Sequence, residues 1–338
     1  MKETAKNEKK GNAFSNNPLV KAVGSQQIVV LLAVVVLFLV FSIASKSFRQ
    51  YTTILSLLDT VYYIAFMAIG VTFCLITGGV DLSIGTGMIC YSLIGAYLVV
   101  HVGVPVWVGI LVSILCGVIM GFFNGFLVAV LNLPPFIATL CSMMITRGVG
   151  SIFTGGLSVA WPSSGSAQGA YRNLFKLNTG SIIIPVGFIL VLVATIVMST
   201  VLNKTRPGRY IIAIGSNKEA LRLSGVNVIK WQWLAYVISG LFTGFASIAY
   251  AGVLASSVAP GAGAGLEMDA ICAAIIGGTS MNGGSGTVVG TLLGVFVMAL
   301  LKIGLPFVGF QANMQQIITG LVLILAVFID VLKNKARS

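Results

Sequence analysis

The sequence predicts an all-α, polytopic membrane protein with about ten transmembrane helices. Hydrophobic residues make up 57% of the chain and charged residues only 8%, whereas soluble domains carry about 25% charged residues. A membrane-spanning helix needs roughly 20 apolar residues, and most of the chain lies in stretches without Lys, Arg, Asp or Glu. These stretches are residues 22–45, 60–80, 82–146, 177–203, 231–266, 270–301 and 303–329.

The basic residues indicate which segments lie in the cytoplasm. The net charge is +12, and five, six and three of the 20 Lys and Arg fall in an N-terminal segment (1–27), a loop (203–230) and a C-terminal tail (333–338). Cytoplasmic loops of membrane proteins are enriched in Lys and Arg. We therefore expect all three segments on the cytoplasmic side, flanking a transmembrane permease domain at 28–332, and no nucleic-acid partner.

The spans follow from this topology. Six crossings must precede the basic loop and four must follow it. The window 270–301 is short for two complete crossings, so the first is expected to be short or interrupted by glycine, as in many transporters. The expected spans are 28–45, 60–77, 83–101, 105–131, 136–154, 181–202, 231–256, 268–278, 286–303 and 312–332.

Motifs of enzymes and metal sites are absent from the sequence. It contains no HExxH, GxSxG or GxGxxG motif and no phosphate-binding GxxxxGK[ST] loop. The five cysteines form no CxxC pair. We expect a chain without catalytic residues, bound metal or cofactor.

Glycines recur every four residues in three places. Such small-residue stripes let helix backbones approach closely inside a membrane. We expect packing within one bundle, while a seam between two chains remains an alternative. The stripes are Gly117, Gly121 and Gly125; Gly240 and Gly244; and Gly286, Gly290 and Gly294.

The basic loop contains a short helix with recognisable ends. Asn217 suits a helix start, Glu219 its positive first turn and Gly225 its end. About two turns are marginal alone in water, so we expect this segment to dock on a partner; a solvated basic loop is the alternative. The residues expected to carry that docking are Asn217, Glu219, Ala220, Leu221, Ser224 and Gly225.

Polar residues at the ends of apolar spans are candidate pathway, gate or helix-capping residues. Asp81 with Ser83 is expected to cap the third helix, with a gate residue as the alternative. Glu267 and Asp269 are either helix-start acids or acceptors for sugar hydroxyls at the outer mouth. The full set is Gly78, Gly79, Asp81, Ser83, Asn124, Glu267, Asp269, Thr279 and Asn282.

Three blocks of sequence resemble the membrane subunits of bacterial ABC importers for ribose, xylose, galactose and related sugars, and most closely the ribose-type branch. ITGGVDLSIG is similar to the element after that family's second helix. TRPGRYIIAIGSNKEALRLSGVNV is similar to its cytoplasmic coupling loop, and GLEMDAICAAIIGGTSMNGGSGTVVGTLLG to its C-terminal block.

This resemblance implies a set of partners and a location. A separate ABC ATPase, which binds the ATP, would dock near Glu219 to Ser224, and an external substrate-binding protein would deliver a small sugar. A second permease subunit, identical or paralogous, would complete the pathway in the bacterial cytoplasmic membrane. The alternative is an ion-coupled secondary carrier that works without an ATPase, because such carriers use intramembrane carboxylates.

Overall fold

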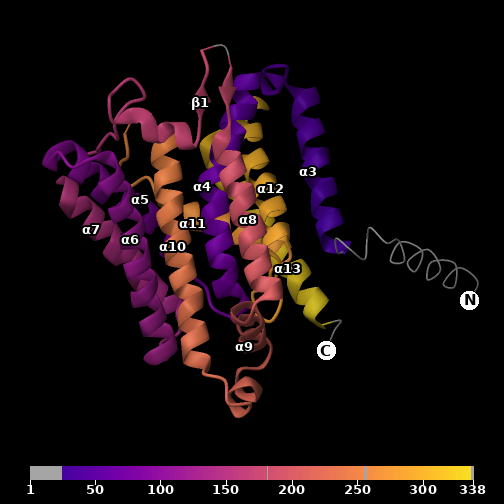
Figure 1. Ribbon diagram of the computed structural model, residues 1–338. Helices are drawn as coiled ribbons and strands as arrows, with labels where there is room; N and C mark the ends of the chain where they lie inside the picture. The colour runs from indigo at the N-terminus through magenta and orange to yellow at the C-terminus, as the bar shows by residue number, and fades with distance from the viewer. Residues whose placement is uncertain (1–24, 181, 255–256, 336–338) are drawn as a thin grey trace, which may run out of the picture.

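The computed structural model describes residues 25–180, 182–254 and 257–335, and these form a helical bundle (Figure 1). The α-helices are α3 (Ser25–Ala44), α4 (Tyr51–Ile76), α5 (Ile84–Tyr97), α6 (Val106–Gly125), α7 (Pro135–Thr154), α8 (Val186–Lys204), α9 (Arg206–Leu223), α10 (Val228–Leu254), α11 (Leu266–Ile276), α12 (Val288–Phe307) and α13 (Ala312–Lys335). The shorter elements are η1 (Ser47–Arg49), η2 (Leu98–Val102), η3 (Phe126–Val130), η4 (Gly169–Leu174), β1 (Leu177–Asn178) and β2 (Ile183–Ile184).

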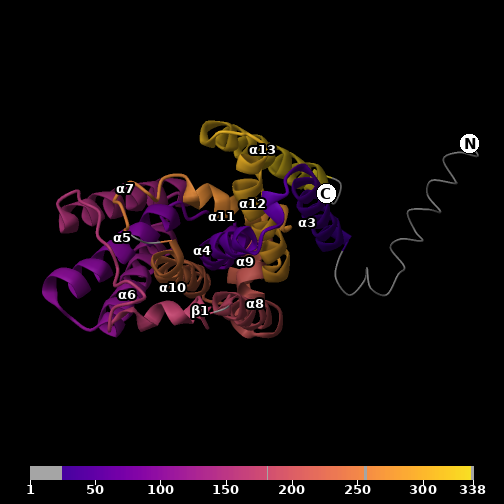
Figure 2. The same ribbon diagram turned by 90° about the horizontal axis from the view of Figure 1, so that it is seen from above.

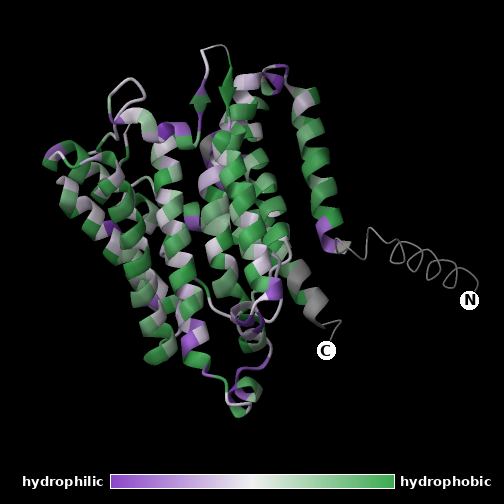
Figure 3. Cartoon of the chain, in the orientation of Figure 1, coloured by the Kyte–Doolittle hydropathy of each residue, from purple (hydrophilic) through white to green (hydrophobic). Residues whose placement is uncertain are grey.

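Eight helices of the described chain are long and apolar enough to cross a membrane. Together with α11 and α13, they occupy the ten stretches in which spans were expected. Figure 3 shows hydrophobic residues along the lengths of these helices. The all-α, polytopic membrane architecture is therefore confirmed.

Three features lie at one end of the bundle: the start of α3, the whole of α9 and the end of α13 (Figure 1). The hairpin of β1 and β2 lies at the opposite end (Figure 1). This arrangement agrees with a basic loop and a C-terminal tail on one side of the membrane. Most of the N-terminal segment (1–24) and the last residues of the tail (336–338) lie outside the described residues.

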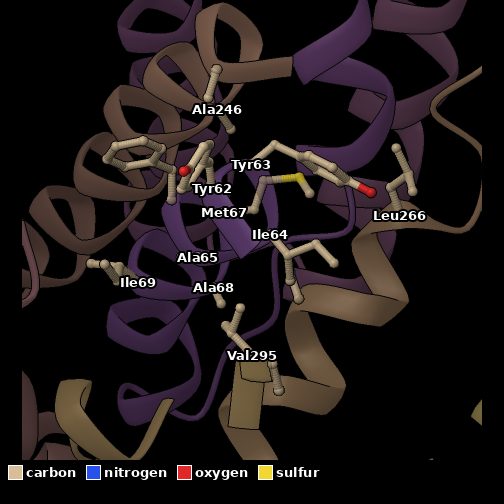
Figure 4. Close-up of a cluster of buried hydrophobic side chains, with 14 of the residues drawn as sticks. Tyr62, Tyr63, Ile64, Ala65, Met67, Ala68, Ile69, Ala246, Leu266 and Val295 are labelled. Atoms are coloured by element: carbon tan, nitrogen blue, oxygen red, sulfur yellow. The ribbon is translucent and has the colours of Figure 1, made fainter. Parts of the chain in front are cut away.

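Helix α4 is the centre of the bundle. In its apolar stretch 83% of the residues are buried, against 17% in α3 at the edge. Figure 2 shows α4 between α10 on one side and α12 on the other. Its side chains, including Tyr62, Tyr63 and Met67, form the core shown in Figure 4.

The glycine stripes pack against partners in the same chain. A side chain on Gly117 would collide with the carbonyl of Gly240, and one on Gly244 would approach the Ile114 backbone to 2.8 Å. A side chain on Gly290 would likewise collide with the Gly277 backbone. Backbones this close require glycine, and the expected packing within one bundle is confirmed.

Two expected spans begin five or more residues away from the observed helix start, whereas the others begin within three residues of it. Helix α4 starts at Tyr51 rather than at residue 60. Asp59, the acid that precedes the expected span, lies within the helix and forms an ion pair with Lys176. Helix α8 starts at Val186 rather than at residue 181, because β1 and β2 pair antiparallel as a hairpin that includes Ile183 and Ile184.

Helix α11 is the interrupted crossing that the sequence predicts. Its 11 residues extend about 16 Å at 1.5 Å per residue, roughly half of a hydrocarbon core of about 30 Å. The helix starts after Gly265, whose φ of 88° belongs to the left-handed region that favours glycine. The crossing therefore contains non-helical backbone.

Candidate functional site

The basic loop folds into two short helices joined at Asn217. These helices lie end to end within α9, and the extended backbone of Asn217 (φ −159°, ψ 96°) separates them. The side chain of Asn217 accepts a hydrogen bond from the Ala220 amide at 2.9 Å, as the expected cap requires. Gly225 follows with a φ of 81°. The sequence did not predict the first helix, which begins at Arg206.

The second of these helices presents apolar side chains that the described chain leaves uncovered. Leu223 is 88% exposed, Ala220 is exposed and Leu221 is half-buried. Glu219 and Arg222 form an exposed ion pair at 3.9 Å, and such a pair contributes little stability. This segment is therefore available to a partner at the end of the bundle where α9 lies (Figure 1).

The first half of α9 is packed into the bundle by backbone contacts. A side chain on Gly215 would collide with the carbonyl of Ile76 and the amide of Gly284. That amide donates a hydrogen bond to the Ile76 carbonyl at 2.9 Å. Gly215 therefore contacts both the end of α4 and the loop that follows α11.

The two glycine-rich breaks after α4 and α11 meet at this point. Gly78 and Gly283 have φ values of 80° and 86°, and a side chain on Gly78 would lie 3.5 Å from the Asn282 carbonyl. A side chain on Gly79 would collide with the Tyr236 hydroxyl. The structure thus brings together Gly78 and Asn282, which are far apart in the sequence.

Thr279 lies in the second break and is fully buried. Its hydroxyl has no hydrogen-bond partner among the described residues. A buried hydroxyl without a partner is costly.

Asp81 is the centre of a buried hydrogen-bond network. Its Oδ1 accepts bonds from the Ser83 amide (3.0 Å), the Ser83 hydroxyl (2.6 Å) and the Asn124 side-chain amide (3.4 Å). Its Oδ2 accepts a bond from the Ser239 hydroxyl at 2.8 Å. Ser142 donates to Asn124 at 2.5 Å and so extends the network to α7.

The network changes the role expected for Asp81. A helix-capping side chain bonds the amides of the first helical turn, but Asp81 bonds only the amide of Ser83, the residue before α5. The expected cap is therefore wrong. Side chains of α6 and α10 donate hydrogen bonds to the carboxylate. Burying a charged group without hydrogen-bond partners costs free energy, and these donors offset that cost.

The two acids at the start of α11 have different surroundings. Glu267 Oε1 accepts a bond from the Gly265 amide at 3.2 Å, and its Oε2 has no partner among the described residues. Asp269 accepts a bond from Lys302 of α12 at 2.6 Å. No hydrogen bond that the described residues make joins either acid to Asp81 or to the glycine-rich breaks.

Sequence reasoning missed several members of these networks. No feature of the sequence marks Ser142 and Ser239 as network residues, because serines are common in packed membrane helices. Lys302 could have been found from the sequence, because it is the single charged residue between the charge-free stretches 270–301 and 303–329. A single charge inside such a stretch indicates a partner or a function.

Within the residues that the structure describes, no group of three or more His, Cys, Asp and Glu side chains is placed to hold a metal ion. The polar clusters above therefore consist of hydrogen bonds and single ion pairs.

Comparison with known proteins supports a role in transport. The ribose import permease protein RbsC of Escherichia coli (strain K12) is 34% identical over 307 residues, which cover 89% of this chain and 92% of that protein. The ribose import permease protein RbsC of Bacillus subtilis (strain 168) is 35% identical over 299 residues, which cover 88% of this chain and 91% of that protein. The galactose/methyl galactoside import permease protein MglC of Haemophilus influenzae is 34% identical over 290 residues, covering 80% of this chain and 84% of its own.

No solved structure matches the chain at a significant level. The family described as "Branched-chain amino acid transport system / permease component" matches residues 53–327, which is most of the chain. The chain therefore belongs to this family of transport permeases and is a multi-pass protein of the bacterial plasma membrane.

Proposed function

We propose that the chain is the transmembrane subunit of an ATP-driven importer for a small sugar, with a ribose-like monosaccharide as the favoured substrate. The chain itself performs no covalent chemistry. A separate ATPase binds and hydrolyses ATP, an external binding protein delivers the sugar, and the bundle switches between two packings. The sugar class rests on the relatives, which include permeases named for ribose, galactose and L-arabinose.

The observation that carries this proposal is the short helix after Asn217. This helix is capped, and its Leu223 side chain is 88% exposed. So short a helix is marginally stable in water, and its exposed apolar side chains add nothing to the stability of the isolated subunit. Docking in a groove of an ATPase would bury its apolar side chains. We therefore assign Lys218 to Ser224 as the ATPase-docking segment.

The packing of α9 supports a route for motion from the ATPase to the pathway. Gly215 lies against the Ile76 carbonyl and the Gly284 amide, so a displacement of α9 acts directly on the end of α4 and on the loop after α11. Tightly packed backbone transmits displacement because it has little room to deform. The two glycine-rich breaks would move together with the docked helix.

The opposite end of the bundle carries a folded surface suited to a binding protein. The Trp161 indole donates to the Ser92 hydroxyl at 3.0 Å, and Lys176 forms an ion pair with Asp59. These contacts hold the segment between α7 and α8 against the bundle. A docking protein would meet an ordered surface and lose less conformational entropy on binding.

Arg147 supports the presence of a second permease subunit. This residue lies within α7, its side chain is exposed, and it makes no ion pair or hydrogen bond to the described residues. A charged residue inside a spanning helix rarely faces lipid. A second permease subunit, identical or paralogous, would place protein or an aqueous pathway against this face.

The test is sugar uptake into proteoliposomes that contain the permease, its ATPase and its binding protein. With the binding protein outside the vesicles and ATP inside them, we expect D-ribose uptake by the complexes whose ATPase faces the lumen, and no uptake with a proton gradient alone. The buried Glu267 oxygen without a partner is what a proton-coupled carrier would use. Uptake driven by the gradient without ATPase would establish that alternative and refute the proposal.

A further inference from the structure

A cavity of about 380 Å³ lies between α11, α12 and α13. Small-molecule sites occupy roughly 300–1,000 Å³, so the cavity has room for a monosaccharide. Figure 2 shows α11 beside α12 and α13 when the bundle is seen from above. Its polar lining residues are Asp269, Lys302, Gln315, Gln316 and Thr319.

An ion pair forms one wall of the cavity. Lys302 Nζ donates to Asp269 Oδ2 at 2.6 Å, and the two side chains remain 35% and 12% exposed. An ammonium group has three donors and a carboxylate has about four acceptor positions. The pair therefore neutralises its own charge and still offers hydrogen-bonding positions to a solute.

Helix α13 supplies the opposite wall. Gln315, Gln316 and Thr319 line the cavity, and none of the three side chains hydrogen-bonds to a described residue. Ile317 and Ile324 are 64% and 65% exposed on the outside of the bundle. Gln315 and Thr319 are half-buried and Gln316 is exposed at the cavity, while these two isoleucines of the helix face outward.

The remaining lining is apolar and includes Leu266, Met268 and Met298. Figure 4 shows the Tyr63 ring reaching from α4 toward Leu266. A monosaccharide presents hydroxyl groups and apolar C–H groups, and this lining complements both. The cavity also adjoins the start of the broken helix α11, and broken helices are where transporters place their substrate sites.

We propose that this cavity is a binding site for a neutral monosaccharide on the transport pathway, formed by Asp269, Lys302, Gln315, Gln316 and Thr319. The site rests on the proposed import function and adds to it the position at which the permease holds the sugar. A zwitterionic amino acid would have to separate Lys302 from Asp269, whereas a neutral sugar can bind with the ion pair intact. The unpartnered amide and hydroxyl groups of α13 favour the sugar.

A direct test uses cysteine alkylation on the full-length chain in isolated membranes, with the five native cysteines replaced. Thr319→Cys should react with N-ethylmaleimide several-fold more slowly in D-ribose. Asn313→Cys, an exposed position of α13 outside the cavity lining, should react equally with and without the sugar. No slowing of Thr319→Cys by D-ribose, D-xylose, L-arabinose or D-galactose would overturn the proposal, and slowing by L-leucine alone would assign the cavity to amino acids instead.

A second measurement separates this site from the import function. In proteoliposomes with ATPase and binding protein, Gln315→Leu combined with Thr319→Val should lower D-ribose uptake about tenfold, which corresponds to about 1.4 kcal/mol. ATP hydrolysis stimulated by the loaded binding protein should persist, and Asn313→Leu should leave both activities unchanged. Normal uptake in the double variant, or equal loss of uptake and hydrolysis, would overturn the site. Absence of ATP-driven uptake by the wild-type chain would instead refute the import function.

Discussion

The backbone amide of Gly284 donates a hydrogen bond to the carbonyl of Ile76 at 2.9 Å, and this bond joins the glycine-rich loop after α11 to the last turn of α4. Gly215 of α9 lies against both groups. One point therefore connects the first half of α9, the central helix and the loop after the broken helix. A relative movement of these three elements would disturb this contact.

Gly215→Val should uncouple ATP hydrolysis from uptake. A side chain at this position collides with the Ile76 carbonyl and the Gly284 amide, and overpacking of this kind costs about 1–3 kcal/mol. We expect sugar uptake to fall about tenfold or more while the ATPase still co-purifies. Gly148→Val in α7 is the matched control, because a side chain there would meet nothing within 4 Å. Full uptake by Gly215→Val would show that this contact transmits no motion.

Leu223→Asp should weaken binding of the ATPase. Leu223 is 88% exposed in the isolated chain, so the bundle should insert and fold normally, whereas an unpaired charge at a docked interface should cost about 2 kcal/mol or more. We expect poor recovery of the ATPase in a pull-down and loss of uptake. Leu221→Asp, at a half-buried position, should have the same effect.

Lys204→Ala is the control for this experiment, because Lys204 is an exposed basic residue at the end of α8 and lies outside the segment Lys218 to Ser224. It should change ATPase recovery little. Normal ATPase recovery and normal sugar uptake with both leucine variants would show that the segment does not dock the ATPase and that its basic residues only orient the chain in the membrane. The main structural reason for an ATP-driven mechanism would then be lost.

Asp81→Ala should destabilise the bundle, whereas Asp81→Asn should be much milder. Alanine leaves the Ser83 amide, the Ser83 hydroxyl and the Ser239 hydroxyl without their acceptor, and each buried unsatisfied group costs about 1–3 kcal/mol. Asparagine keeps one oxygen acceptor, and its amide can donate to a rotated Ser239 hydroxyl. Thermal unfolding of the purified variants in detergent would show a large drop in Tm for alanine and a small one for asparagine.

Uptake by the same two variants, corrected for the amount in the membrane, distinguishes structure from proton transfer. Neither alanine nor asparagine titrates. A stable Asp81→Asn variant without any uptake would therefore mean that the carboxylate carries a proton and does more than hold α5, α6 and α10 together.

Single cysteines should report the orientation of the bundle. Lys218→Cys, in the segment at the α9 end (Figure 1), should be protected from an impermeant thiol reagent added outside intact cells whose permease lacks native cysteines. Ala167→Cys, at an exposed position between α7 and α8, should be labelled. The opposite pattern would invert the topology. The basic residues of the loop at 203–230 are the physical reason for the expected orientation.

The sequence by itself determined the fold class, the approximate positions of the ten helices and the capped segment at Asn217. Each depends on a local property. A hydrocarbon core excludes charge and unpaired backbone groups, so charge-free stretches become helices, and a cap involves only neighbours such as Asn217 and Ala220.

Only the tertiary structure decided which distant groups meet. Asp59 could remain inside α4 because Lys176 lies beside it, and Asp81 bonds Ser239 rather than capping α5. The cavity required Lys302 and Gln315 to approach from different helices. Hydropathy describes how each helix interacts with lipid and carries no information about which helix face meets which. That choice depends on the close packing of glycine backbones and on the pairing of buried polar groups, which form only when the whole bundle assembles.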